Sequence, residues 1–215
     1  ARSLKAQRSG TMGLVVTSLT DPFFAEVMAG VDKIASEAGL SMFVTASHND
    51  PEREMRVIET FHRRRVEGII VAASRLSSRY HQRLERIQVP IVLINQHAED
   101  TQPRFHSVAF DEQAGARLAA EHLLLQGHRR IGYLGLGNRQ RSNRLRLAGY
   151  REALREAGID ADPAWALVVP EIEIQARGDS EVGESSCPSL LNSGVTAVLC
   201  YNDRVAIGAL EACRS

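Results

Sequence analysis

The chain has 215 residues, of which 44% are hydrophobic and 24% charged, and its formal net charge is zero. This length and composition predict one or two globular domains, and the charge gives no sign of nucleic-acid or membrane binding by the whole chain. Its three cysteines include no CxxC pair, which favours a reducing compartment, and no apolar run is long enough to cross a membrane. We therefore expect a cytoplasmic protein with no membrane partner.

The first half of the chain alternates strands with helices. Its apolar runs lack polar alternation, which predicts a parallel sheet covered by helices on both faces. The predicted strands are Met12–Ser18, Ser41–Ser47, Gly68–Ser74, Pro90–Asn95 and His106–Phe110. The predicted helices are Pro22–Ala38, Pro51–Arg65 and Ser78–Ile87. Asp-Pro pairs begin the first two of these helices, as is typical of helix starts.

The first predicted helix begins with two adjacent phenylalanines. Apolar residues at three- and four-residue steps predict one core-facing stripe: Phe24, Val27, Met28, Val31, Ile34, Ala35 and Ala38. Phe23 lies off that stripe, just after the first strand. A large apolar ring in this position indicates a contact outside the core.

The alternation restarts after residue 110. Asp111 is expected to cap a helix that runs to Gln126, and Gly127 to end it. The later strands are predicted at Arg130–Leu136, Trp165–Val169 and Thr196–Asn202, and the later helices at Asn143–Ala157, Gly183–Asn192 and Arg204–Cys213. Pro188 weakens the prediction of the helix that contains it, because a helix accepts proline readily only in its first turn.

This pattern predicts an α/β protein with two doubly wound parallel-sheet lobes. The N-terminal lobe is expected to span residues 11–108 and the C-terminal lobe residues 109–215, with residues 1–10 before them. The second lobe is expected to be truncated at its C-terminus, because the chain ends on a helix without a returning strand.

Motifs typical of enzymes are absent from the sequence. The GxGxxG dinucleotide spacing fails because Gln140 takes the place of the third glycine after Gly135 and Gly137. There is no GxxxxGK[ST], no GxSxG and no histidine pair at metal-ligand spacing. We therefore expect neither catalysis nor a metal or other cofactor.

Polar side chains at the predicted strand ends indicate a binding site. Ligands of open parallel sheets bind outside the carboxyl ends of the strands, where Asp21, Asp111 and Asp203 lie. Each carboxylate either caps a helix or accepts the hydroxyls of a sugar's vicinal diol. Arg146 lies near the start of a helix, where the macrodipole disfavours a cation. It is either a solvated surface residue or a ligand-binding group, whereas Arg144 is expected at the surface.

Six stretches of the chain resemble successive landmarks of one family. In order they are "ARSLKAQRSGTMGLVV", "DPFFAEVMAGV", "VEGIIVAAS", "EHLLLQGHRRIGYL", "RLAGYREALREAGI" and "TAVLCYNDRVAIGAL". Together they are similar to the lac-repressor-like (LacI/GalR) family of bacterial transcription regulators. The resemblance implies two periplasmic-binding-protein-like lobes with a small-molecule effector in the cleft between them.

The resemblance also implies which residues contact the effector. The residues at matching positions are Phe23, Phe24, Asp111, Arg146 and Asp203, joined by Thr17, Ser142 and Asn202. Asp21 is added to this set as a strand-end carboxylate. After the fourth strand the family commonly has an arginine, and Gln96 takes that position here. Phe23 is expected to form an apolar floor for a ligand ring, and Phe24 to pack at the edge of the core.

The resemblance further implies a homodimer that binds operator DNA. The family's N-terminal helix-turn-helix domain is absent, and "ARSL" resembles the tail of its hinge helix, in which Leu4 would enter the minor groove. The alternative is that residues 1–10 are a basic tail without fixed structure. Effector binding would change the angle between the lobes, and with it the spacing of the hinge helices.

The chain is therefore interpreted as the effector-binding and dimerisation core of a sugar-responsive transcription regulator. An alternative from another class is a sugar-binding transport receptor of the periplasmic type, which has the same lobes but needs a signal peptide and no hinge. A nucleotide-dependent enzyme is a third hypothesis, which the failed glycine spacing opposes. The sequence leaves open whether the effector is a sugar, a purine base or a sugar phosphate, and whether it releases or promotes DNA binding.

Overall fold

The computed structural model describes residues 9–74, 76, 80–95 and 105–214. It contains two compact units, which divide between Phe110 and Asp111, and each unit is built on one parallel sheet. The predicted α/β class with two parallel sheets is confirmed. The expectations for Leu4, for Gln96 and for the hinge segment 1–8 lie outside the described residues. Among the helices of the described ranges, none has the length and hydropathy needed to span a bilayer.

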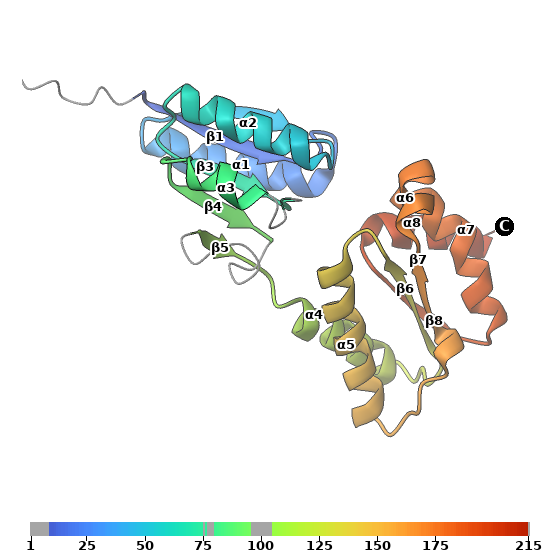
Figure 1. The fold of residues 1–215 in the computed structure, drawn as a ribbon. Helices are drawn as coiled ribbons and strands as arrows, with labels where there is room; N and C mark the ends of the chain where they lie inside the picture. The colour runs from blue at the N-terminus through green and yellow to red at the C-terminus, as the bar shows by residue number, and fades with distance from the viewer. Residues whose placement is uncertain (1–8, 75, 77–79, 96–104, 215) are drawn as a thin grey trace, which may run out of the picture. The chain divides into compact units, whose positions relative to one another are not determined.

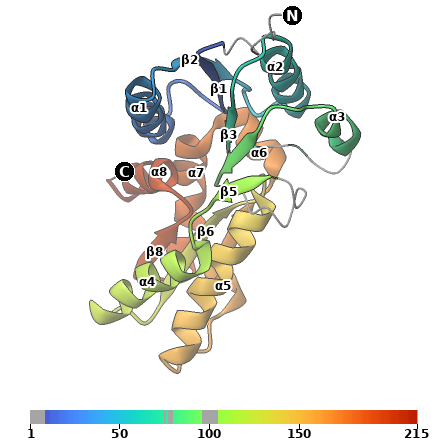
Figure 2. The ribbon, with the colours of Figure 1, turned by 90° about the vertical axis from the view of Figure 1, so that its left-hand side faces the viewer.

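Unit 1 contains a five-stranded sheet in the order β2-β1-β3-β4-β5, a doubly wound arrangement. Its strands are β1 Thr11–Val16, β2 Ser41–Ala46, β3 Ile69–Ala72, β4 Ile91–Ile94 and β5 His106–Val108. Its helices are α1 Pro22–Glu37, α2 Pro51–Arg63 and α3 His81–Glu85. Helix α1 covers one face of the sheet, and α2 and α3 cover the other (Figure 2).

The buried stripe of α1 is shorter than the sequence predicts. Phe24 and Ala35 are buried, and Met28 packs against the core cluster beneath the helix. Ile34 is 62% exposed and Ala38 is also exposed, so the prediction is wrong for these two residues. Helix α1 contacts β1 and the edge strand β2.

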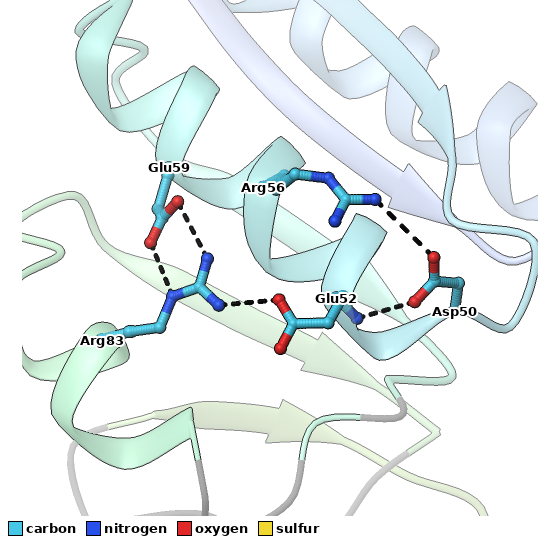
Figure 3. A network of polar contacts seen from close by, with 5 residues as sticks. All are labelled: Asp50, Glu52, Arg56, Glu59 and Arg83. Atoms are coloured by element: carbon cyan, nitrogen blue, oxygen red, sulfur yellow. Dashed lines mark hydrogen bonds and ion pairs between the residues drawn. The ribbon is translucent and has the colours of Figure 1, made fainter.

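Helices α2 and α3 are joined by a polar network (Figure 3). Arg83 on α3 donates through Nε to Glu59 Oε1 and through Nη1 to Glu52 Oε2, both at 2.9 Å. At the start of α2, Arg56 Nη2 lies 3.7 Å from Oδ2 of Asp50, whose Oδ1 caps the helix. The hydrogen bond from Arg83 holds the pKa of the Glu59 carboxyl below its usual value.

Unit 2 contains a three-stranded sheet in the order β7-β6-β8. Its strands are β6 Ile131–Leu136, β7 Ala166–Val169 and β8 Ala197–Cys200. Its helices are α4 Glu112–Leu125, α5 Gln140–Glu156, the short 3-10 helix η3 Pro163–Trp165, α6 Glu171–Arg177, α7 Asp179–Asn192 and α8 Asp203–Arg214. Helices α4 and α5 cover one face of the sheet, and α6, α7 and α8 cover the other (Figure 1).

The helices of unit 2 depart from the prediction in three places. Helix α6 was not predicted, α5 begins three residues early, and α7 begins at Asp179 and contains Pro188 in its interior. Close packing of α7 on α8 accounts for the helical state of α7. A Cβ added at Gly183 would lie only 2.1 Å from the Val205 carbonyl oxygen, so the two helix backbones touch there. Tertiary packing at this crossing outweighs the hydrogen bond that proline removes.

Candidate ligand-binding site

The predicted site residues that the structure describes follow strand ends or begin helices. In unit 1 these residues are Thr17, Asp21, Phe23 and Phe24, which all follow β1. In unit 2 they are Asp111, Ser142, Arg146, Asn202 and Asp203, at or near the starts of α4, α5 and α8. Each unit therefore carries its own cluster of candidate ligand contacts.

Unit 1 presents two exposed aromatic rings, those of Phe23 and Phe110. Phe23 is 39% exposed, whereas Phe24 is 3% exposed and packs in the core. The Phe23 ring lies edge-on to Phe24, with 5.1 Å between centroids, and to Phe110, with 6.2 Å between centroids. Phe110 follows β5, is 54% exposed and was not predicted to take part. Together Phe23 and Phe110 offer an apolar surface suited to the face of a ligand ring.

Asp21 and Asp111 both cap helices, which is one of the two roles that the sequence allows for these carboxylates. One oxygen of Asp21 accepts the Phe23 N–H at 3.0 Å, and one oxygen of Asp111 accepts the Ala114 N–H at 2.9 Å. A cap of this kind uses a single carboxylate oxygen, which is compatible with a ligand hydroxyl on the other. Thr17 lies buried just after β1, and its carbonyl accepts the His48 N–H at 3.0 Å.

Arg146 is held by two residues from other elements of unit 2. Its Nε donates to Glu112 Oε2 and its Nη1 donates to the carbonyl of Tyr201. The guanidinium also stacks on the Tyr201 ring, with Cζ 4.3 Å from the centroid. The side chain of Glu112 is 6% exposed and that of Arg146 is 25% exposed. These contacts exclude the interpretation of Arg146 as a solvated surface residue, whereas Arg144 is exposed as expected.

Glu112 also binds Ser142, another predicted site residue. The Ser142 hydroxyl donates to Glu112 Oε1 at 2.7 Å, so both carboxylate oxygens have partners. Tyr133 on β6 holds the start of α5, because its hydroxyl donates to Asn143 Oδ1 at 2.9 Å. Burial raises the pKa of Tyr133 well above its usual range. Strand β6 and helix α4 together position the first turns of α5.

Asn202, rather than Asp203, caps α8. The Asn202 Oδ1 accepts the Val205 N–H at 2.9 Å, while its Nδ2 donates to Asp179 Oδ2 at 2.8 Å. Asp203 is the first residue of α8 and is exposed. The capping interpretation of Asp203 is therefore wrong, and its carboxylate faces solvent. Within the described ranges, no three His, Cys, Asp or Glu side chains are arranged to hold a metal ion.

Open parallel sheets with aromatic and polar side chains beyond the strand ends are typical of α/β proteins that bind small molecules. Residues 9–215 match the family described as "Periplasmic binding proteins and sugar binding domain of LacI family". The chain belongs to this family.

Individual relatives agree with this assignment. The HTH-type transcriptional regulator GalR of Escherichia coli is 34% identical over 98% of this chain and 59% of its own length. The ribose operon repressor of Haemophilus influenzae is 33% identical over 99% of this chain and 61% of its own. The crystal structure of the transcription regulator CcpA of Lactococcus lactis matches with a TM-score of 0.81 at 30% identity, over 95% of this chain and 72% of CcpA. The chain thus spans about three fifths of the length of these two curated relatives.

Proposed function

We propose that this chain is the effector-binding and dimerisation core of a sugar-responsive transcription regulator. The description of its family includes the sugar-binding domain of LacI-type proteins. GalR and the ribose operon repressor, which match almost the whole chain, are a transcriptional regulator and an operon repressor. Those relatives are regulators rather than enzymes or transport receptors, which favours regulation over both alternative hypotheses. Operator binding is assigned to the whole protein, through its hinge and helix-turn-helix domain.

The single observation that carries the proposal is the polar network of unit 2. This network fixes Arg146 beside the starts of α4 and α8, where the remaining N–H groups of the arginine can donate to hydroxyls. The exposed carboxylates of Asp111 and Asp203 supply acceptors in the same unit. Phe23 and Phe110 of unit 1 supply an apolar surface for the ring of a sugar. We propose, as the family resemblance implies, that one effector contacts both units.

In this proposal the effector acts by favouring one conformation of a two-state protein. Contacts that differ between the two states shift the equilibrium by their difference in free energy. In a homodimer, the shift would reach the hinge helices as a change in their spacing. The protein would act in the cytoplasm, where its operator is accessible.

The first experiment is a thermal-shift screen with neutral sugars, sugar phosphates and purine bases. A ligand that binds only the native state raises the melting temperature, so an effector among these compounds is identified by a higher Tm. If no sugar raises it, the proposed function is wrong.

Arg146→Lys then tests the site, with Arg144→Lys as the matched control. Lysine keeps a cation beside the buried Glu112 but loses the planar fork of donors. Loss of one charge-assisted hydrogen bond costs about 1.5–3 kcal/mol, or roughly ten- to a hundredfold in affinity. Calorimetry should show this loss for Arg146→Lys and none for Arg144→Lys, whose side chain is exposed two residues away. Equal affinity in both variants would remove Arg146 from the site.

A further inference from the structure

We propose that Glu112 restricts the effector to an uncharged, polyhydroxylated sugar and disfavours an anionic one such as a sugar phosphate. The inference rests on the proposed function and concerns the charge of the ligand that the same site accepts. It starts from one observation: the site arginine already has a carboxylate partner inside unit 2.

The carboxylate of Glu112 is built into the fold. Its side chain is 6% exposed, and its two oxygens accept hydrogen bonds from Ser142 and Arg146. A charge this buried is stable only when it is paired and hydrogen-bonded, so the Glu112 carboxylate and the Arg146 guanidinium form a built-in ion pair. The two charges of this pair cancel, so the N–H groups of Arg146 are presented without a net positive charge from the pair.

Arg146 nevertheless keeps donors for a ligand. A guanidinium has five N–H groups, and the contacts to Glu112 and to the Tyr201 carbonyl each use one. A sugar hydroxyl can accept from the remaining groups without meeting any repulsion. A phosphate on the same guanidinium would lie a few ångströms from the Glu112 carboxylate, and two like charges that close repel strongly in a partly buried site.

The neighbouring charges act in the same direction. Asp111 and Asp203 are exposed carboxylates at the starts of α4 and α8, able to accept hydroxyls and certain to repel an anion. Cations also flank these helix starts: Arg139 and Arg141 are partly buried at the start of α5, and Arg204 is exposed beside Asp203 at the start of α8. A phosphorylated effector would have to use these arginines in place of Arg146.

Calorimetry on the intact chain tests the inference with two matched pairs of probes. These are ribose with ribose 5-phosphate, and galactose with galactose 6-phosphate. We expect at least one neutral sugar to bind about tenfold or more tightly than its phosphate, the effect of one unfavourable charge contact of about 1.4 kcal/mol. Equal or tighter binding of the phosphate in both pairs would overturn the inference.

Glu112→Gln tests whether this residue sets the preference. The substitution removes the carboxylate charge and leaves Arg146 as an uncompensated cation, so the preference for the neutral sugar should fall about tenfold. Glu211→Gln is the control, because it removes an exposed carboxylate paired with Arg214 elsewhere in unit 2. An unchanged preference in Glu112→Gln, or an equal change in Glu211→Gln, would contradict the assignment.

The outcomes separate the two proposals. Binding of phosphates in preference to neutral sugars would overturn the charge inference and leave a sugar-responsive core intact. Binding of no sugar of either kind would overturn both. If Glu112→Gln does not fold, as thermal unfolding will reveal, the wild-type comparison of each sugar with its phosphate still decides the inference.

Discussion

Replacing Gly208 with alanine should force α7 and α8 apart and destabilise unit 2. A Cβ at this position would lie 1.8 Å from the Ser180 carbonyl oxygen and 2.8 Å from the Glu184 backbone nitrogen. Both atoms belong to the backbone of α7, so neither can turn away as the end of a side chain could. The two helices must therefore separate by an ångström or more, and the packing around Val182 and Val205 must loosen with them.

The size of the effect follows from two opposing contributions. Overpacking typically costs about 1–3 kcal/mol, and an obstacle made of backbone places this substitution at the upper end of that range. The better helix propensity of alanine offsets about 1 kcal/mol. The net loss is then about 2 kcal/mol, which for a domain of about 100 residues lowers Tm by roughly 10 °C.

Urea unfolding followed by the fluorescence of Trp165 measures this loss in unit 2. Trp165 is the single tryptophan of the chain and packs against the core cluster that α7 and α8 share. Gly115→Ala is the matched control: Gly115 lies in α4 of the same unit, and its added Cβ would meet no described atom within 4 Å. That control should be neutral or more stable by up to about 1 kcal/mol. A loss below about 0.5 kcal/mol for Gly208→Ala, or an equal loss in both variants, would refute the reasoning.

Two further predictions concern titration and thiol reactivity. Because Arg83 lowers the pKa of Glu59, the ion pair stabilises the fold above the usual value of 4.5, and this contribution is lost as pH falls through the lower folded value. Arg83→Ala should raise the Glu59 pKa measured by NMR and cost no more than about 1 kcal/mol at neutral pH; an unchanged pKa would contradict the pairing. Iodoacetamide at pH 8 should alkylate exposed Cys213 first, because burial raises the pKa of Cys187 to about 11 and that of Cys200 to about 12. Equal rates for the three thiols, measured by mass spectrometry, would contradict this order.

The elements that sequence patterns predict well are the buried parallel strands. A strand covered on both faces reads as a continuous apolar run, and each of the eight predicted strands is present, with bounds that differ from the prediction by at most two residues. The prediction fails where tertiary contact decides the state of the chain. Pro188 argues against a helix locally, whereas Gly183 permits a backbone contact with α8 that no local pattern reveals.

In the candidate site, too, local contacts were predictable from the sequence, whereas contacts between distant residues were not. Asp21 and Asp111 were predictable as caps because capping is a local interaction between residues two or three positions apart. Glu112 was missed because an acidic residue in the first turn of a helix is ordinary by itself. Its partner Arg146 lies 34 positions away, and only the fold brings the two together.

The polar network explains how unit 2 accommodates Arg146, a cation whose position the sequence analysis singled out. The predicted helix start at Asn143 placed Arg146 in the first turn, where the macrodipole disfavours a cation by about 0.3–1 kcal/mol. In the structure α5 begins at Gln140, so Arg146 lies in the second turn, beyond the reach of that effect. Here the Glu112 carboxylate compensates that cation while standing in the first turn of α4, where the dipole favours an anion. The Tyr201 carbonyl and ring, just beyond β8, hold the other side of the guanidinium. Contacts from α4 and from the residue that follows β8 thus converge on one side chain of α5 and fix the orientation of its guanidinium, as the proposed ligand site requires.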